Sequence, residues 1–335
     1  MKEAQVSKGT VVVIKDVEIP QPGPKQVVIK VVVSGTNPKD WKLPEVGIQN
    51  DANTGDDIAG YVHSVGSEVY EFKPGDRVAS FHEMMTPGGS FAEYAVGWQH
   101  TTFHIPKSVS FEEAATIPLA AMTSAIGLQL RLGLPDPWTP VSDGKKLPLV
   151  VYGGASAVGA FAIKIARKAN IHPIIAVAGR GISYVETLLD RSKGDTIVDY
   201  RGGDDAVVKG IRDALQGEKL THALDAVSEH SSYLNIAKVL EPHGTIALVL
   251  PGKEYKDLPE TVTVTMTMVA SAHAEDADFA HVMFRWMARG LQEGWFKGHP
   301  FEVVPGGLQG VETGLRNLKE GKASAVKYVY KIGEE

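Results

Sequence analysis

The stretch from Leu149 to Asn170, LVVYGGASAVGAFAIKIARKAN, decides the fold. An apolar run at 149–152 is typical of a buried strand, and the apolar spacing from residue 158 onward predicts an amphipathic helix. Small residues fill the turn between them: Gly153, Gly154, Ala155, Ser156, Ala157 and Gly159. In a βαβ unit such a turn lets backbone N–H groups and the helix N-terminus approach a pyrophosphate.

The glycine pattern of this turn is incomplete, because Ser156 and Ala157 stand where glycine is expected in G-x-G-x-x-G. The motif by itself leaves two interpretations open, a nucleotide-binding turn and an ordinary tight turn between a strand and a helix. A hydroxyl at position 156 would donate a hydrogen bond to a phosphate oxygen, which favours the first interpretation.

The chain on either side of the turn predicts the architecture. Apolar strands and amphipathic helices alternate from residue 149 to residue 250, which is typical of a parallel sheet covered on both faces, the doubly wound α/β class. Ser110 is predicted to cap a preceding helix, with Glu113 three residues later. TVTVTMTMV at 261–269 reads as a further strand, with an edge that is either covered internally or paired across a dimer.

The first hundred residues carry short β-rich runs separated by Gly and Pro, such as QVVIKVVVSG at 26–35, which predict an antiparallel, barrel-like domain. The tail reads as a long helix near 276–296 and a closing strand near 324–332. We therefore predict a split domain, residues 1–118 with 271–335, around an inserted nucleotide domain at 119–270.

Composition excludes several classes of protein. The chain has 335 residues, no Cys and a formal net charge of -6, so disulfides, thiolate nucleophiles and Cys-containing zinc sites are excluded. The chain has no basic run of the kind that predicts nucleic-acid binding, and none of its apolar runs reaches the roughly 20 residues that span a bilayer. We expect a cytoplasmic protein without membrane or nucleic-acid partners.

The residues after the second predicted strand of the nucleotide domain indicate the cofactor. NAD-preferring sites hold the ribose 2′-hydroxyl with an acid about 20 residues beyond the turn. Here AVAGRGISY offers Arg180 and Ser183, with no acid until Glu186. A cation at this place pairs with a 2′-phosphate, so the sequence favours NADPH; the alternative is that Arg180 is a solvated surface charge.

These pieces together resemble the zinc-independent quinone oxidoreductase and enoyl reductase branch of the medium-chain dehydrogenase/reductases. Within that branch the chain is most similar to fungal trans-acting enoyl reductases and the related toxin-cluster reductases. The elements that match the family in order are NPKD (37–40), GDDIAGYVHSVG (55–66), KPGDRV (73–78), GGSFAEYAV (88–96), FEEAATIPLAAMTSAIGL (111–128), VVYGGASAVGAFAIKIA (150–166), DTIVDYR (195–201), ALDAV (223–227) and EGKASAVKYV (320–329).

The resemblance implies a GroES-like substrate domain, a Rossmann-type domain and an NADPH site in the cleft between them. By position, it implies catalytic roles for Asn37, Lys42 and Thr123. It implies cofactor contacts for Pro38 and Asp40 on the nicotinamide side, Gly154, Ala155, Ser156, Ala157 and Val158 at the pyrophosphate turn, Arg180, Ser183 and Tyr200 around the 2′-phosphate, Leu248 along the nicotinamide wall, and Lys327 from the last strand.

Each assignment has a structural alternative. Asn37 and Pro38 also suit a turn, and Asp40 suits a helix cap. Tyr200 also suits the cover of a strand end, and lysines such as Lys42 and Lys327 are mostly solvated.

Metal chemistry is not expected. Asn37 stands in the place of the Cys ligand of zinc-bearing relatives and Asp56 in the place of their His ligand. His100 and His104 have an i, i+4 spacing, but in the strand and turn predicted here they lie about 13 Å apart, too far for one ion. A simple alcohol is therefore a poor substrate, because no metal stabilises the alkoxide that forms at hydride transfer, whereas a conjugated alkene or a quinone is already an electrophilic hydride acceptor.

Three functions stay open at this point. The first is NADPH-dependent reduction of an α,β-unsaturated thioester or carbonyl, free or delivered on the carrier protein of a polyketide synthase. The others are quinone reduction and NADPH binding without turnover. Protonation would come from solvent or Lys42, and the protein would be a monomer or a homodimer.

Overall fold

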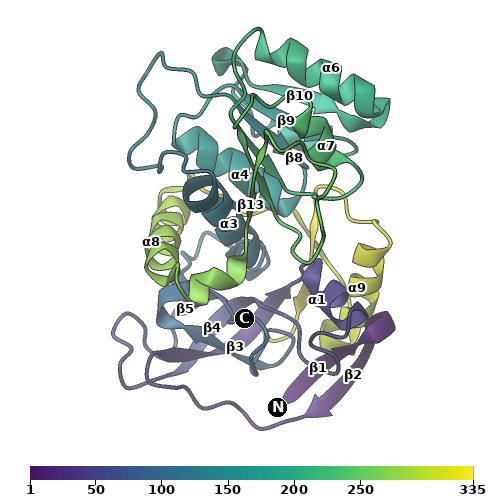
Figure 1. The fold of residues 1–335 in the computed structure, drawn as a ribbon. Helices are drawn as coiled ribbons and strands as arrows, with labels where there is room; N and C mark the ends of the chain where they lie inside the picture. Colours follow the sequence, from purple (N-terminus) through teal and green to yellow (C-terminus); the bar gives the residue numbers. More distant parts are fainter. Residues whose placement is uncertain (335) are drawn as a thin grey trace. The chain divides into compact units, whose positions relative to one another are not determined.

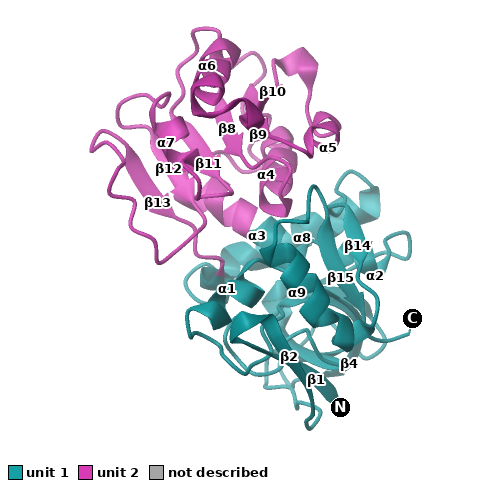
Figure 2. Ribbon diagram, turned by 90° about the vertical axis from the view of Figure 1, so that its right-hand side faces the viewer, with its two compact units in different colours: residues 1–122, 270–335 teal, residues 123–269 magenta. Residues whose placement is uncertain are grey.

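The computed structural model describes residues 1–334, which form two units (Figures 1 and 2). Unit 1 comprises residues 1–122 and 270–335, and unit 2 comprises residues 123–269. Each unit has its own sheet and its own core.

Unit 1 is built on a seven-stranded sheet in the order β14-β15-β3-β4-β5-β7, with β6 pairing with β3. All its pairs are antiparallel except β14 with β15. Its strands are β3 (Gln26–Gly35), β4 (Asp57–Val65), β5 (Arg77–Phe81), β6 (Tyr94–Trp98), β7 (Thr102–His104), β14 (Phe301–Val303) and β15 (Lys327–Lys331). The strands β1 (Lys2–Ser7) and β2 (Val11–Asp16) form a separate antiparallel pair.

Unit 1 also contains helices. They are α1 (Lys39–Glu45), α2 (Phe111–Ala114), α8 (Ala277–Glu293) and α9 (Val311–Lys319); the unit boundary falls inside α3 (Pro118–Ala125). Helix α8 buries Met283, Phe284 and Met287 on one face, and Phe284 stacks on Phe103 with ring centroids 5.2 Å apart. Ser110 caps α2 as predicted, accepting a hydrogen bond from the N–H of Glu113 at 3.1 Å.

Unit 2 contains a six-stranded parallel sheet in the order β10-β9-β8-β11-β12-β13. This is the doubly wound order, in which the chain moves outward in one direction from the first strand and then in the other. The strands are β8 (Leu149–Tyr152), β9 (Ile174–Ala178), β10 (Thr196–Asp199), β11 (His222–Asp225), β12 (Thr245–Leu248) and β13 (Thr263–Met266). The helices are α4 (Ala157–Lys168), α5 (Ile182–Glu186), α6 (Asp204–Leu215) and α7 (Ser232–Ala237), and a π-helical segment Ile126–Arg131 follows α3.

Some elements differ from the prediction. The sequence SYVETLLDRSK at 183–193 predicts one helix within the alternation after residue 149, but α5 ends at Glu186 and a short 3-10 turn, Arg191–Lys193, follows. Asp190 interrupts the helix, because its backbone is extended and its side chain caps the 3-10 turn through the N–H of Ser192. The sequence patterns had not indicated β1, β7, β14 or α9.

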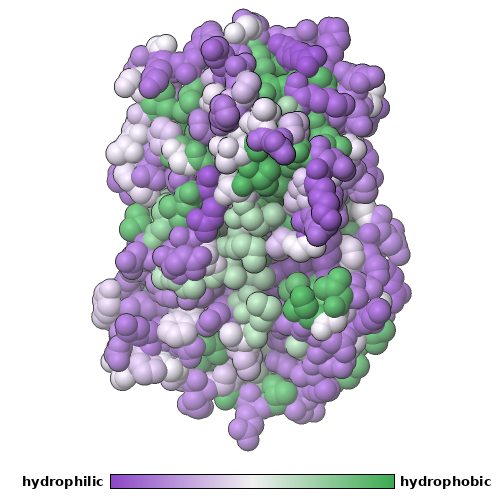
Figure 3. Space-filling view, viewed as in Figure 1, coloured by the Kyte–Doolittle hydropathy of each residue, from purple (hydrophilic) through white to green (hydrophobic). Residues whose placement is uncertain are grey.

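The surface shown in Figure 3 is mostly hydrophilic, with small groups of hydrophobic residues. Among residues 1–334, no helix combines the length and the apolar character that crossing a bilayer requires.

Candidate functional site

The turn from β8 into α4 brings the predicted pyrophosphate residues together. Gly153 adopts a left-handed backbone with φ 79°, a conformation that glycine adopts without strain. Ser156 is the N-cap of α4, and its Oγ accepts a hydrogen bond from the N–H of Gly159 at 3.0 Å. This capping role was not foreseen, and it leaves the hydroxyl proton available to donate.

Close packing explains why the last small residue of the motif is glycine. A Cβ at Gly159 would lie 2.2 Å from the carbonyl oxygen of Gly153 and 2.9 Å from Cα of Gly154. Helix α4 therefore rests directly on the turn. Ala155, Ser156, Ala157 and Val158 are only half-buried, and the first-turn N–H groups of a helix have no intrahelical acceptors, so this turn is suited to an anion.

The turn lies at the topological switch point of the sheet. β8 is flanked by β9 and β11, and the crossovers from β8 and from β11 leave in opposite directions, which opens the crevice where such folds bind ligands. The N–H of Ala226 donates to the carbonyl of Tyr152 at 3.0 Å. A Cβ at Gly153 would meet Cγ2 of Val227 at 2.7 Å, so the two strand ends are packed against each other.

At the end of β9, the residue that precedes Arg180 lies against the ring of Tyr200. The Tyr200 ring covers the backbone of Gly179, since a Cβ there would lie 2.5 Å from Cζ of the ring. Arg180 is exposed and Tyr200 is 44% exposed. Ser183 is also exposed, in the first turn of α5. The first acid after this strand, Glu186, forms an ion pair with Arg191 at 2.5 Å.

The loop between β11 and α7 contributes residues that sequence reasoning missed. Asp225 is fully buried, and its carboxylate accepts hydrogen bonds from the N–H groups of Val227 (2.9 Å) and Ser228 (2.8 Å) and from the hydroxyl of Ser232 (2.5 Å). Burial raises the pKa of Asp225, and these hydrogen bonds oppose the rise. The signal was the acid at the end of the apolar run HALD.

Ser228 links the ends of two neighbouring strands. It has φ 57° and is fully buried. Its Oγ accepts a hydrogen bond from the N–H of Val249 at 3.0 Å, directly after Leu248, the buried last residue of β12. The predicted wall residue Leu248 is thus held in register with the loop that Asp225 organises.

In unit 1, Asn37 and Lys327 meet at a buried carboxylate, Asp57. The Asn37 amide Nδ2 donates to Asp57 at 2.7 Å, and the Lys327 ammonium contacts Asp57 at 2.5 Å and the Asn37 carbonyl oxygen at 3.1 Å. All three side chains are at least nine-tenths buried. The sequence analysis did not identify Asp57 as a site residue. The pattern that could have indicated it is GDD at 55–57, in which two adjacent acids directly precede an apolar run.

A second buried cluster adjoins the first through the backbone of Asn37. The Lys39 ammonium contacts Asp40 at 2.8 Å and Asp56 at 2.5 Å, and the other oxygen of Asp56 bonds Nδ1 of His82 at 2.9 Å. The second oxygen of Asp40 accepts a hydrogen bond from the N–H of Asn37 at 2.7 Å. Asp40 is fully buried, so the structure places it beneath the turn that carries Asn37.

The charged groups of this second cluster shift one another's pKa values. Burial raises the pKa of Asp40 to about 7 against the opposing effect of Lys39. Burial alone would also raise the pKa of Asp56, but Lys39 and His82 hold it below its usual value. Burial alone would lower the pKa of Lys39, yet the two carboxylates raise it above its ordinary value.

The remaining predicted residues of the substrate side lie on α1 and α3. Pro38 is exposed at the start of α1, and Lys42 is half-buried one turn later, with its ammonium 5.7 Å from the centre of the Trp41 ring. Thr123 is 6% exposed on α3. The first turn of α3 is anchored by the N–H of Leu119, which donates to Asp57 at 2.7 Å.

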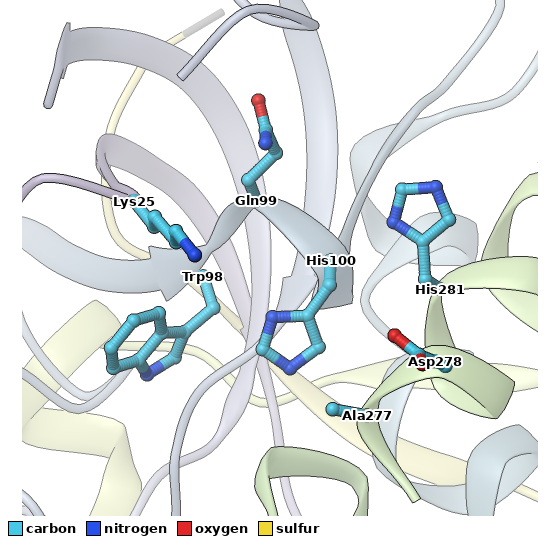
Figure 4. A pocket seen from close by; sticks show the side chains of 7 residues that line it. All are labelled: Lys25, Trp98, Gln99, His100, Ala277, Asp278 and His281. Atoms are coloured by element: carbon cyan, nitrogen blue, oxygen red, sulfur yellow. The ribbon is translucent and has the colours of Figure 1, made fainter. Parts of the chain in front are cut away.

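The rings of His100 and His104 each bind a backbone carbonyl and are not arranged as a pair of metal ligands. Nε2 of His100 bonds the carbonyl of Ala272 at 3.0 Å, and Nε2 of His104 bonds the carbonyl of Glu71 at 3.2 Å. Over the described part of the chain, no group of three or more His, Cys, Asp or Glu side chains is arranged to hold a metal ion. His100 instead lines a small surface pocket with Trp98 and His281 (Figure 4), away from the predicted site residues.

Comparisons with known proteins agree with this geometry. Residues 23–107 match the family described as the alcohol dehydrogenase GroES-like domain. The chain is 50% identical over 312 residues to trans-enoyl reductase fsr4 of Gibberella fujikuroi, covering 92% of each chain. In structure it resembles the CurK enoyl reductase (TM-score 0.76, 20% identity, 98% of each chain) and a quinone oxidoreductase of Pseudomonas syringae pv. Tomato DC3000 (TM-score 0.77, 22% identity, covering 98% of this chain and 99% of that one).

Proposed function

The chain belongs to the enoyl reductase and quinone oxidoreductase branch of the medium-chain dehydrogenase/reductases, an oxidoreductase family that uses a nicotinamide cofactor, and from this premise we propose its reaction. The protein reduces the activated C=C bond of an α,β-unsaturated thioester or carbonyl with NADPH. The observation that carries the proposal is the 50% identity, over 92% of the chain, to a protein named trans-enoyl reductase.

The residues of unit 2 fit the proposed cofactor. The small residues of the 153–159 turn allow a pyrophosphate to approach the N-terminus of α4, with the Ser156 hydroxyl as a further donor. Arg180 follows β9, and the ring of Tyr200, which follows β10, covers the neighbouring Gly179. At this place a guanidinium pairs with a 2′-phosphate and a carboxylate would repel it. These contacts support NADPH over NADH.

The protein needs to activate the substrate only a little, because conjugation already makes the β-carbon of the substrate electrophilic. When bound, NADPH supplies the hydride that this carbon accepts. The carbonyl oxygen then gains negative charge, and Lys42 and Thr123 are the side chains proposed to donate hydrogen bonds to it. A proton from solvent or from Lys42 completes the saturated product at the α-carbon.

The Asn37–Asp57–Lys327 cluster helps to position the side chains proposed to act on the substrate. Asp57 binds the Asn37 amide, the Lys327 ammonium and the first turn of α3. It therefore fixes the turn that leads into α1, which carries Lys42, and the start of the helix that carries Thr123. Accurate placement of donors and acceptor is worth a large part of an enzymatic rate enhancement.

The proposed physiological substrate is an acyl chain delivered as a thioester on a carrier protein of a polyketide synthase. The 50% identity to a protein named trans-enoyl reductase, together with the resemblance to trans-acting reductases that partner polyketide synthases, supports this assignment.

The test is steady-state oxidation of NADPH with crotonyl and longer enoyl thioesters, run beside a panel of quinones. We expect saturated thioester to form in step with NADPH consumption, and Lys42→Met and Thr123→Val to lower kcat. Turnover of quinones together with failure of every enoyl thioester would overturn the proposal in favour of quinone reduction. Tight NADPH binding without turnover of any acceptor would overturn it in favour of a binding protein.

A further inference from the structure

The Lys39 side chain contacts oxygen atoms of three residues in two segments of unit 1. Its ammonium lies 2.8 Å from Asp40 in α1, and 2.5 Å from both Asp56 and the backbone carbonyl of Thr54 in the loop before β4. The Lys39 side chain is 14% exposed, whereas both carboxylates are fully buried. One cation therefore compensates two carboxylates that have lost their contact with water.

The neighbouring groups complete this arrangement. Asp56 uses its other oxygen for Nδ1 of His82, and its backbone carbonyl accepts the N–H of His82 at 2.9 Å. The Thr54 hydroxyl donates to the carbonyl of Asp40 at 3.1 Å. α1, the loop before β4 and the end of β5 are therefore joined through the groups around the ammonium.

The same groups do not fit a divalent metal ion. Asn37 and Asp56 stand where zinc-bearing relatives carry Cys and His ligands. Here the Asn37 amide is engaged by Asp57 and Lys327, and both oxygens of Asp56 are engaged by Lys39 and His82. The donor atoms are thus used within the chain, and the positive charge at this place is an ammonium.

We propose that the Lys39 ammonium is a built-in cation that takes the organising role of the metal and acts as a positioning residue for turnover. Asp40, held by Lys39, fixes the N–H of Asn37 at 2.7 Å. Lys42 follows Lys39 by three residues, about one turn, on α1. Loss of the ammonium shifts the Asn37 turn and α1, so this inference rests on the proposed roles of Asn37 and Lys42 in the reaction.

The first variant is Lys39→Met, which keeps the length of the side chain and removes its charge. We expect at least a tenfold fall in kcat, with the Kd for NADPH within twofold of the parent protein, because the proposed contacts with the pyrophosphate and the 2′-phosphate lie in unit 2. Lys146→Met is the matched control: it breaks an exposed ion pair with Glu218 (2.8 Å) and should change neither value. Parent values of kcat and melting temperature in Lys39→Met would overturn the proposal.

A second variant separates charge balance from simple loss of packing. Lys39→Met/Asp56→Asn removes one of the two carboxylates left without their cation, so its melting temperature should recover part of what Lys39→Met loses. The double variant should fold even if the single variant does not. A double variant no more stable than the single one would overturn the built-in cation. This comparison of melting temperatures decides the matter even if the parent protein lacks enoyl reductase activity, which would count against the proposed function alone.

A metal arm completes the test. The parent protein, dialysed against EDTA and then supplied with Zn²⁺, should keep the same kcat at each stage. Loss of activity on chelation with recovery on adding Zn²⁺ would contradict the role assigned to Lys39.

Discussion

Replacement of Ser156 separates the capping role that the structure shows for its hydroxyl from the phosphate-binding role proposed for it. The oxygen caps α4 by accepting the Gly159 N–H at 3.0 Å, and the proton is proposed to reach the cofactor pyrophosphate. Ser156→Ala removes both, so it should lower the free energy of unfolding by about 1 kcal/mol, the usual cost of a lost N-cap, and also weaken NADPH. Ser156→Asp keeps the cap and places a negative charge where the phosphate binds.

The expected size of the second effect follows from the geometry. Aspartate caps helices about as well as serine, and the first turn of α4 contains no other acid, so Ser156→Asp should keep the stability of the parent. Two unit charges 4 Å apart repel by about 1 kcal/mol in water and about 4 kcal/mol at an effective dielectric constant of about 20. Because about 1.4 kcal/mol is a factor of ten in affinity, a repulsion of about 1 kcal/mol is roughly fivefold, and we expect NADPH to bind at least about fivefold more weakly.

The assay pairs NADPH fluorescence titration with thermal melting of the same samples. Ser110→Asp is the control, since Ser110 caps α2 in unit 1 through the N–H of Glu113; it makes the same chemical change without an expected effect on NADPH. A Ser156→Asp protein that melts normally and binds NADPH as tightly as the parent would refute the assignment of this turn to the pyrophosphate.

Three further changes probe other parts of the account. Arg180→Ala should weaken NADPH at least tenfold more than NADH in competition titrations, whereas equal weakening would remove Arg180 from the 2′-phosphate site. Gly159→Ala should cost about 1–3 kcal/mol in urea unfolding, a usual cost of overpacking, because its Cβ would lie 2.2 Å from the Gly153 oxygen; parent stability would show that the turn yields easily. Burial lowers the pKa of His273 from 6.5 to about 3, so the unfolded chain binds a proton between these values that the folded chain does not, and the free energy of unfolding falls as pH falls through this window. His273→Gln should flatten that fall in urea unfolding measured from pH 7 to pH 4, and parallel curves would contradict the burial of a neutral imidazole.

Most of the fold could be predicted because its signals are local. The β-branched run VVIKVVV at 27–33, interrupted only by Lys30, marks β3, and the period of apolar residues at 204–215 marks α6. The regular alternation after residue 149 predicts a parallel doubly wound sheet, since parallel strands need helical crossovers. Short or weakly apolar elements escaped: β1 has only Ala4 and Val6 facing the core, and β7 is three residues long.

The site could be predicted only in part, for the same physical reason. The proposed nucleotide turn is a continuous stretch, and its small residues indicate that a ligand or another part of the chain approaches the backbone closely. The network of Lys39, Asp56 and His82 joins residues far apart in the chain, and only tertiary packing brings them together. The motif marks Ser156 only as a position where glycine is expected. Its capping role depends on the helix starting at Ala157, which the motif does not determine.

The most direct test of the account is the fate of deuterium from NADPH labelled at C4 of the nicotinamide, followed by mass spectrometry and NMR of the product of a crotonyl thioester. The account predicts a saturated butyryl thioester with one deuterium at the β-carbon and a solvent-derived proton at the α-carbon. Oxidation of the labelled NADPH without deuterium in the thioester, or transfer of it to quinones alone, would contradict the assignment as an enoyl reductase.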